Sequence, residues 1–139
     1  IYLYKLGEEV QAHPDFMFVA SFNPGYQRGF KELKPSTRQR FISLALDYPS
    51  PEVEAEIIVS ETGIDSSTAK RLVKIGNKIR NLTELGLTET ASTRLLVDAA
   101  MLIKTGLAKK IAVDTAIVQP LTDDMDTVDA LNSIASLII

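Results

Sequence analysis

Three polar signals, far apart in the sequence, carry side chains that suit phosphate chemistry. The apolar run 16–22 ends directly on Asn23. Arg38 and Arg40 lie in a basic stretch, and Arg94 opens a later apolar helical pattern. A carboxamide both donates and accepts hydrogen bonds, and the forked donors of arginine match phosphate oxygens. Together these groups could surround a phosphate, which predicts a role in a nucleotide-driven machine.

The loop that would cradle such a phosphate does not occur in these residues. The pattern Gly-x-x-x-x-Gly-Lys-Ser/Thr is absent, and no apolar strand ending in Asp-Glu precedes Asn23. The backbone cradle and a Mg²⁺ ligand of nucleotide hydrolases come from these two motifs. We therefore interpret the chain as a piece of a longer protein, and a first residue of Ile1 instead of Met favours the same view.

Each polar signal also has a plainer interpretation. An Asn-Pro-Gly turn accounts for Asn23, because asparagine bonds its own backbone in turns. Arg94, in the first turn of a helix, opposes the helix dipole by about 0.3–1 kcal/mol unless an anion is bound, but a solvated surface arginine tolerates that. Arg38 and Arg40 are spaced by two and point to different faces, so we expect at most one in any site and a salt bridge for the other.

Composition limits the classes of protein to consider. The chain is 45% hydrophobic and 24% charged, which is ordinary for a globular protein. No apolar run approaches the roughly 20 residues of a membrane-spanning helix, so we expect no membrane span. The absence of Cys excludes disulfides and thiolate metal sites and is compatible with the cytoplasm, our expected location. We expect no metal ligands among these residues.

The charge is unevenly distributed. The net charge is −3, yet residues 28–40 carry five basic side chains and one acidic one. A basic stretch in an acidic chain predicts a bound anion or an acidic partner surface, and not general nucleic-acid binding. A solvated loop with clustered charges is the alternative.

The elements that would position these residues fall into two parts. Residues 1–49 are expected to be β-rich: a hairpin around Gly7, a strand buried on both faces at 16–22, a second strand at 42–46, and a short helix at 36–41.

Residues 50–139 are expected to form a helical bundle, because apolar residues recur at helical spacing after good capping residues. The predicted caps are Ser50 (followed by Pro51), Asp65 and Thr122, and a further apolar helical pattern opens at residues 92–95. Val53, Ile57 and Ile58 are predicted as the buried face of the first of these helices. The predicted fold class is therefore α+β, with strands followed by an all-α bundle.

Several strings together resemble one family. They are the residues 12–16 (AHPDF), 21–27 (SFNPGYQ), 33–41 (LKPSTRQRF) and 91–96 (ASTRLL), with 47–49, 54–57 and 121–124 also similar. They resemble the NorQ/NirQ/CbbQ branch of the MoxR-type AAA+ ATPases, in order and over essentially the whole chain. The resemblance implies that residues 1–49 end a P-loop AAA+ α/β core and that residues 50–139 form its helical lid.

The resemblance also implies roles for the polar residues. Asn23 matches the sensor-1 asparagine that positions the attacking water. Arg40 matches the arginine finger that reaches a neighbouring subunit, and Arg38 is a weaker candidate for that role or for nucleotide contact. Arg94 matches the sensor-2 arginine of the lid. ATP and Mg²⁺ are the implied cofactors of the intact protein, and we expect these residues alone not to hydrolyse ATP.

Partners follow from the same resemblance. It implies a homo-oligomeric ring, usually hexameric, a von Willebrand factor A-type partner, and a client metalloenzyme similar to nitric oxide reductase or rubisco. The implied function is chaperone-like activation or metal-centre maturation of that client. The alternatives are a standalone helical interaction module, which the missing phosphate loop favours, and a helix-turn-helix DNA binder, which the acidic helical part disfavours.

Overall fold

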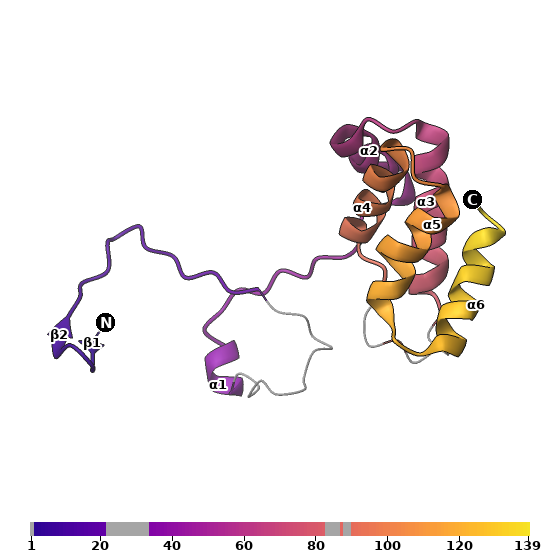
Figure 1. Cartoon of the computed structure of the whole chain (residues 1–139). Coiled ribbons are helices and arrows are strands. Elements are labelled where there is room, and N and C mark those ends of the chain that lie inside the picture. The colour runs from indigo at the N-terminus through magenta and orange to yellow at the C-terminus, as the bar shows by residue number, and fades with distance from the viewer. Residues whose placement is uncertain (1, 22–33, 83–86, 88–89) are drawn as a thin grey trace. The chain divides into compact units, whose positions relative to one another are not determined.

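The computed structural model describes residues 2–21, 34–82, 87 and 90–139, and these are mostly helical with one small sheet. The chain divides into two compact units, Ile1–Leu44 and Ala45–Ile139. In Figure 1 the first unit carries β1, β2 and α1, and the second carries α2 to α6.

A hairpin forms at the start of the first unit. Strands β1 (Tyr2–Leu3) and β2 (Glu8–Glu9) pair antiparallel. Between them the backbone N–H groups of Leu6 and Gly7 both donate to the carbonyl oxygen of Leu3, at 2.9 Å each. Gly7 has φ +68°, in the left-handed region that favours glycine. The hairpin predicted around Gly7 is confirmed, although its strands are shorter than predicted.

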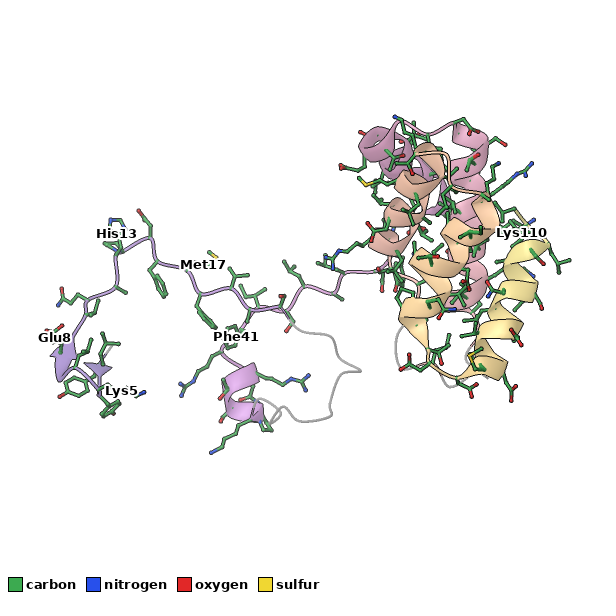
Figure 2. All side chains as sticks on the ribbon, in the orientation of Figure 1. Lys5, Glu8, His13, Met17, Phe41 and Lys110 are labelled. Atoms are coloured by element: carbon green, nitrogen blue, oxygen red, sulfur yellow. The ribbon has the colours of Figure 1, made fainter. Side chains whose placement is uncertain are left out.

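The two strands predicted at 16–22 and 42–46 are wrong for the described residues. Residues 16–21 and 42–46 have no regular secondary structure. Met17 is 80% exposed and Ile42 is 94% exposed, and in Figure 2 Met17 lies on a stretch of chain without helix or strand. A strand that is apolar on both faces needs neighbouring strands and covering layers. The described part of the first unit supplies neither.

Three helices of the second unit begin where the sequence predicts. They are α2 (Pro51–Thr62), α3 (Ser66–Arg80) and α4 (Thr93–Lys104). In each, the capping side chain accepts a hydrogen bond from the backbone N–H three residues on, which satisfies one of the free donors at a helix start. The caps are Ser50, Asp65 and Ser92.

The last part of the second unit contains two helical stretches separated by residues 122–124. Helix α5 (Lys109–Val113) continues into the π-helical turn η2 (Asp114–Val118) and the short 3₁₀ turn η3 (Gln119–Leu121). Helix α6 (Met125–Ser136) follows. Its predicted cap, Thr122, is wrong, because Asp124 accepts from both the backbone N–H and the hydroxyl of Thr127. Two bonds to a carboxylate outcompete the single bonds of a hydroxyl cap.

One apolar core joins these helices. Helix α3 packs against α2, α4 and α6, and α4 also packs against α2 and α5. Figure 1 shows these helices gathered in a single bundle. The largest fully buried apolar side chains come from nearly all of them: Ile58, Leu72, Ile75, Ile79, Leu96, Ile117 and Leu131.

The buried face of α2 differs from the predicted one. Val53 is 49% exposed, whereas Glu54 is fully buried next to Ala55 and Ile58. Of the predicted face, Ile58 is fully buried and Ile57 partly buried, but Val53 is not, because the sequence pattern was fitted to apolar residues alone. The true face includes a carboxylate, and that carboxylate lies at the centre of the candidate site.

Candidate functional site

Arg94 lies in the exposed first turn of α4. The helix begins at Thr93, after the Ser92 cap, and the side chain of Arg94 is exposed. It has no hydrogen-bond or ion-pair partner among the residues that the structure describes. A cation here opposes the helix dipole, and a bound anion would offset that cost. The placement in the first turn is as predicted, and no described residue occupies the donors of Arg94.

A buried ion pair lies next to the first turn of α4. Glu54 of α2 and Arg80 at the end of α3 meet through two parallel bonds, Nη1 to Oε2 at 2.8 Å and Nη2 to Oε1 at 2.7 Å. The side chain of Glu54 has no exposed surface, and that of Arg80 is 8% exposed. Paired bonds of this geometry are among the strongest in proteins and fix the orientation of both groups.

The same pair bonds to the start of α4. Thr93 donates its hydroxyl to Glu54 Oε1 at 2.6 Å, and Arg80 Nε donates to the backbone oxygen of Ala91 at 2.7 Å. Arg80 Nη1 also donates to Asn77 Oδ1 at 3.0 Å. Ala91 and Thr93, the residues on either side of the Ser92 cap, are therefore held by hydrogen bonds to buried side chains of α3 and α2.

Tyr48, in the segment that precedes α2, contacts both Arg80 and Thr90. The Arg80 guanidinium lies 3.7 Å from the centre of the Tyr48 ring, within the range of a cation–π contact. The Tyr48 hydroxyl is 2.7 Å from Thr90 Oγ1. We call these residues the Arg80 network: Tyr48, Glu54, Asn77, Arg80, Thr90, Ala91 and Thr93.

The network keeps Glu54 ionised. Burial by itself raises the pKa of Glu54, but hydrogen bonds from Arg80 and Thr93, together with the charge of Arg80, outweigh burial and lower the pKa below its ordinary value. Among the described residues no buried side-chain nitrogen or oxygen lacks a hydrogen-bond partner. The buried charge is thus fully compensated, as a stable buried pair requires.

Sequence reasoning missed both members of this pair. Glu54 lies one turn before Ile58 on the same face of α2, so a carboxylate interrupts an otherwise buried stripe. That interruption was the available signal. The partner could not be found in the same way, because Arg80 lies 26 residues away and its local pattern resembles that of any basic helix end.

The remaining predicted site residues belong to the first unit. Arg38 is the last residue of α1 (Pro35–Arg38), which confirms a short helix near the predicted 36–41, and Arg40 follows it in a turn. Both side chains are exposed. Asn23 lies outside the described residues. Because Arg94 belongs to the second unit, the three predicted arginines are not brought together within one unit.

A pocket of about 710 Å³ lies between the start of α2 and the second half of α3. Three lysines one helical turn apart, Lys70, Lys74 and Lys78, line it together with Glu52. Arg94, the predicted site residue of the same unit, does not line it. The pocket borders the Arg80 network only through Asn77.

Two further classes of site were sought in the described part of the chain. No group of three or more His, Cys, Asp or Glu side chains there could bind a metal ion. No helix there is both long and apolar enough to cross a membrane.

Comparison with known proteins identifies related sequences. Residues 54–138 match the family model described as CbbQ/NirQ/NorQ C-terminal. The protein CbbQ of Hydrogenophilus thermoluteolus is 52% identical over 131 residues, which is 94% of this chain and 49% of that protein.

Two further relatives are similar to the same extent. The denitrification regulatory protein NirQ of Pseudomonas aeruginosa is 50% identical over 99% of this chain and 53% of its own length. The protein NorQ of Paracoccus denitrificans is 46% identical over 96% of this chain and 50% of its own length. The chain thus spans about half the length of the curated relatives it matches.

Proposed function

Because the chain belongs to the CbbQ/NirQ/NorQ family, we propose that it forms part of a MoxR-type AAA+ ATPase and that α2 to α6 are the nucleotide-sensing lid. In this proposal Arg94 contacts the terminal phosphates of ATP bound between the lid and the α/β core. The intact protein uses ATP and Mg²⁺ and works as a homo-oligomeric ring.

The observation that carries the proposal is that Arg94 has an exposed side chain on a fixed stretch of backbone. Its side chain is exposed and unpaired among the described residues, whereas the backbone on which it stands is tied to buried side chains of two other helices. Because the backbone is already fixed, binding an anion has to order only the side chain of Arg94 and not the helix start as well. A surface arginine with only a solubility role needs no such support.

The first unit supports the proposal in a different way. Its apolar residues Phe16, Met17, Phe18 and Val19 are between 58% and 80% exposed. An apolar run of this kind is typical of a strand in the middle of a parallel sheet, where both faces are covered. We propose that residues 1–49 complete the α/β core of the ATPase, with Asn23 positioning the attacking water and Arg40, or less favourably Arg38, serving a neighbouring subunit.

The names of the relatives guide the proposed biological role. One relative is named a denitrification regulatory protein, and another is named CbbQ. We propose that ATP hydrolysis by the intact protein activates a client enzyme or matures its metal centre, the client resembling nitric oxide reductase or rubisco. A von Willebrand factor A-type protein is the proposed adaptor to that client.

Steady-state ATP hydrolysis by the protein as its gene encodes it tests the proposal. Turnover should fall strongly in Arg40→Ala, because an arginine finger contributes about 10³–10⁵ in rate. Arg71→Ala, which removes another exposed arginine from α3, should leave turnover unchanged. Absence of hydrolysis by the wild-type protein would contradict the proposal and favour a helical interaction module. Unchanged turnover in Arg40→Ala would remove the finger assignment.

A further inference from the structure

We propose that Arg80 is a positioning residue that couples Tyr48, in the connector before α2, to the first turn of α4 and so to Arg94. The connector is residues 45–50, which lead into α2. The proposal rests on the proposed function, in which Arg94 contacts the nucleotide. Through this coupling, the contact of Arg94 with the nucleotide and the position of the connector depend on each other.

The first step of the coupling runs from Arg80 to α4. Arg80 donates to the Ala91 backbone oxygen at 2.7 Å, and Glu54, oriented by Arg80, accepts from the Thr93 hydroxyl at 2.6 Å. These two bonds fix the chain directly before Arg94. A displacement of the Arg80 guanidinium therefore moves or releases the helix start that carries Arg94.

The second step runs from Arg80 to the connector. The Tyr48 ring stacks on the outer face of the guanidinium at 3.7 Å, and its hydroxyl bonds Thr90 Oγ1, two residues before the α4 cap. The ring is 48% exposed, so it does not belong to the apolar core. It contacts Arg80, which bonds the Ala91 backbone, and Thr90, which precedes α4, and this is the arrangement that coupling requires.

The contrast in burial makes the proposal testable. Arg80 and Glu54 are buried, so their removal would disturb the fold as well as the coupling. Tyr48 is half exposed, and its removal would break the coupling while leaving the apolar core in place. Met101, 47% exposed on α4, offers a matched control for the loss of a large exposed side chain.

The experiment is a double-mutant cycle on the protein as its gene encodes it, with the ATP concentration for half-maximal hydrolysis as the readout. Tyr48→Ala should raise that concentration about two- to fivefold, the factor expected for an exposed cation–π contact. The melting temperature should change no more than in Met101→Ala. Tyr48→Ala combined with Arg94→Ala should be no worse than Arg94→Ala alone, because the two residues act on one interaction.

A conservative pair at Thr93 provides the second test. Thr93→Ser keeps the hydroxyl that Glu54 accepts from and should preserve the wild-type half-maximal concentration. Thr93→Val keeps the shape, loses the hydroxyl, and should raise that concentration as Tyr48→Ala does. Equal behaviour of the two variants would overturn the proposed coupling.

The outcomes distinguish failure of the coupling from failure of the proposed function. If the effects of Tyr48→Ala and Arg94→Ala simply multiply, Tyr48 does not act through Arg94 and the coupling is wrong, while the nucleotide role of Arg94 stands. If the wild-type protein shows no nucleotide-dependent turnover, the proposed function fails, and the coupling proposal fails with it.

Discussion

The two units of this chain make opposite use of their apolar residues. In the second unit Ile58, Leu72 and Leu96 are fully buried between helices. In the first, Met17 and Ile42 are 80% and 94% exposed, and the described regular structure is a two-pair ladder and a four-residue helix. Both units contain apolar segments that suit a core, but among the described residues a buried core forms in the second unit alone.

The difference reflects how helices and strands satisfy their backbone groups. A helix makes its hydrogen bonds within one segment, so a sequence of about 90 residues can supply several helices and their packing partners. A strand makes its bonds with another strand, which can come from a distant part of the polypeptide. The helices of the second unit therefore form a core among themselves, whereas the described residues of the first unit do not.

The largest effect that tests this contrast comes from dividing the chain. A protein of residues 45–139 should unfold cooperatively with the melting temperature of residues 1–139, because its core lies wholly within it. A peptide of residues 1–44 should show no cooperative unfolding by circular dichroism. A melting temperature several degrees lower for residues 45–139 would show that the first unit stabilises the second.

The next largest effect concerns the buried charge in the second unit. Glu54→Ala leaves Arg80 buried without its partner and should destabilise residues 45–139 by about 3–5 kcal/mol. Glu56→Ala, which removes an exposed carboxylate from the same helix, is the control and should change stability by less than about 0.5 kcal/mol. Denaturant unfolding measures both, and similar values for the two variants would remove Glu54 from the account of stability.

Acid should weaken the same interaction without mutation. Because the pKa of Glu54 is lowered on folding, its stabilising contribution is complete above the pKa of a free glutamate, about 4.3, and is lost as the pH falls through the lower folded-state pKa. Asp65 and Asp124 act in the same direction, since hydrogen bonds from Thr68 and Thr127 lower the pKa of these caps.

Melting temperatures from pH 7 to pH 3 separate these contributions. The wild-type protein should lose more stability over the acid part of this range than Glu54→Gln, which has no carboxylate to protonate at that site. Parallel curves for the two proteins would show that Glu54 does not titrate differently in the folded state.

The smallest effect concerns the cap of α4. Ser92→Ala removes the acceptor for the Leu95 N–H, a bond of 3.5 Å, and should destabilise the second unit by about 0.5–1 kcal/mol, the lower part of the usual range for a cap. Ser133→Ala, at an exposed position of α6, is the control. A loss above about 2 kcal/mol would show that Ser92 does more than cap the helix.

Sequence predicted the helical unit well because its signals are local. Ser50, Asp65 and Ser92 each bond a backbone group three residues away, so the residues that define each helix start adjoin one another in the sequence. The last cap was wrong because Thr122 and Asp124 are both good caps, and only the bonds to Thr127 distinguish them.

The site was less predictable than the helices. The position of Arg94 in the first turn of α4 followed from the same local signals. The pairing of Glu54 with Arg80 did not, because it joins two helices through a choice of helix rotation that no local pattern encodes. The roles assigned to Asn23, Arg38, Arg40 and Arg94 remain predictions, and they depend on residues of the two units acting together.

The most direct test of the central claim is the equilibrium affinity for ATP of the protein as its gene encodes it. Arg94→Ala should bind ATP about tenfold or more weakly than the wild-type protein, since a hydrogen-bonded charge contact is lost. Arg71→Ala, the exposed arginine on α3, should bind as the wild type does. Equal affinities for Arg94→Ala and the wild type would contradict the claim that this helical unit presents Arg94 to a nucleotide.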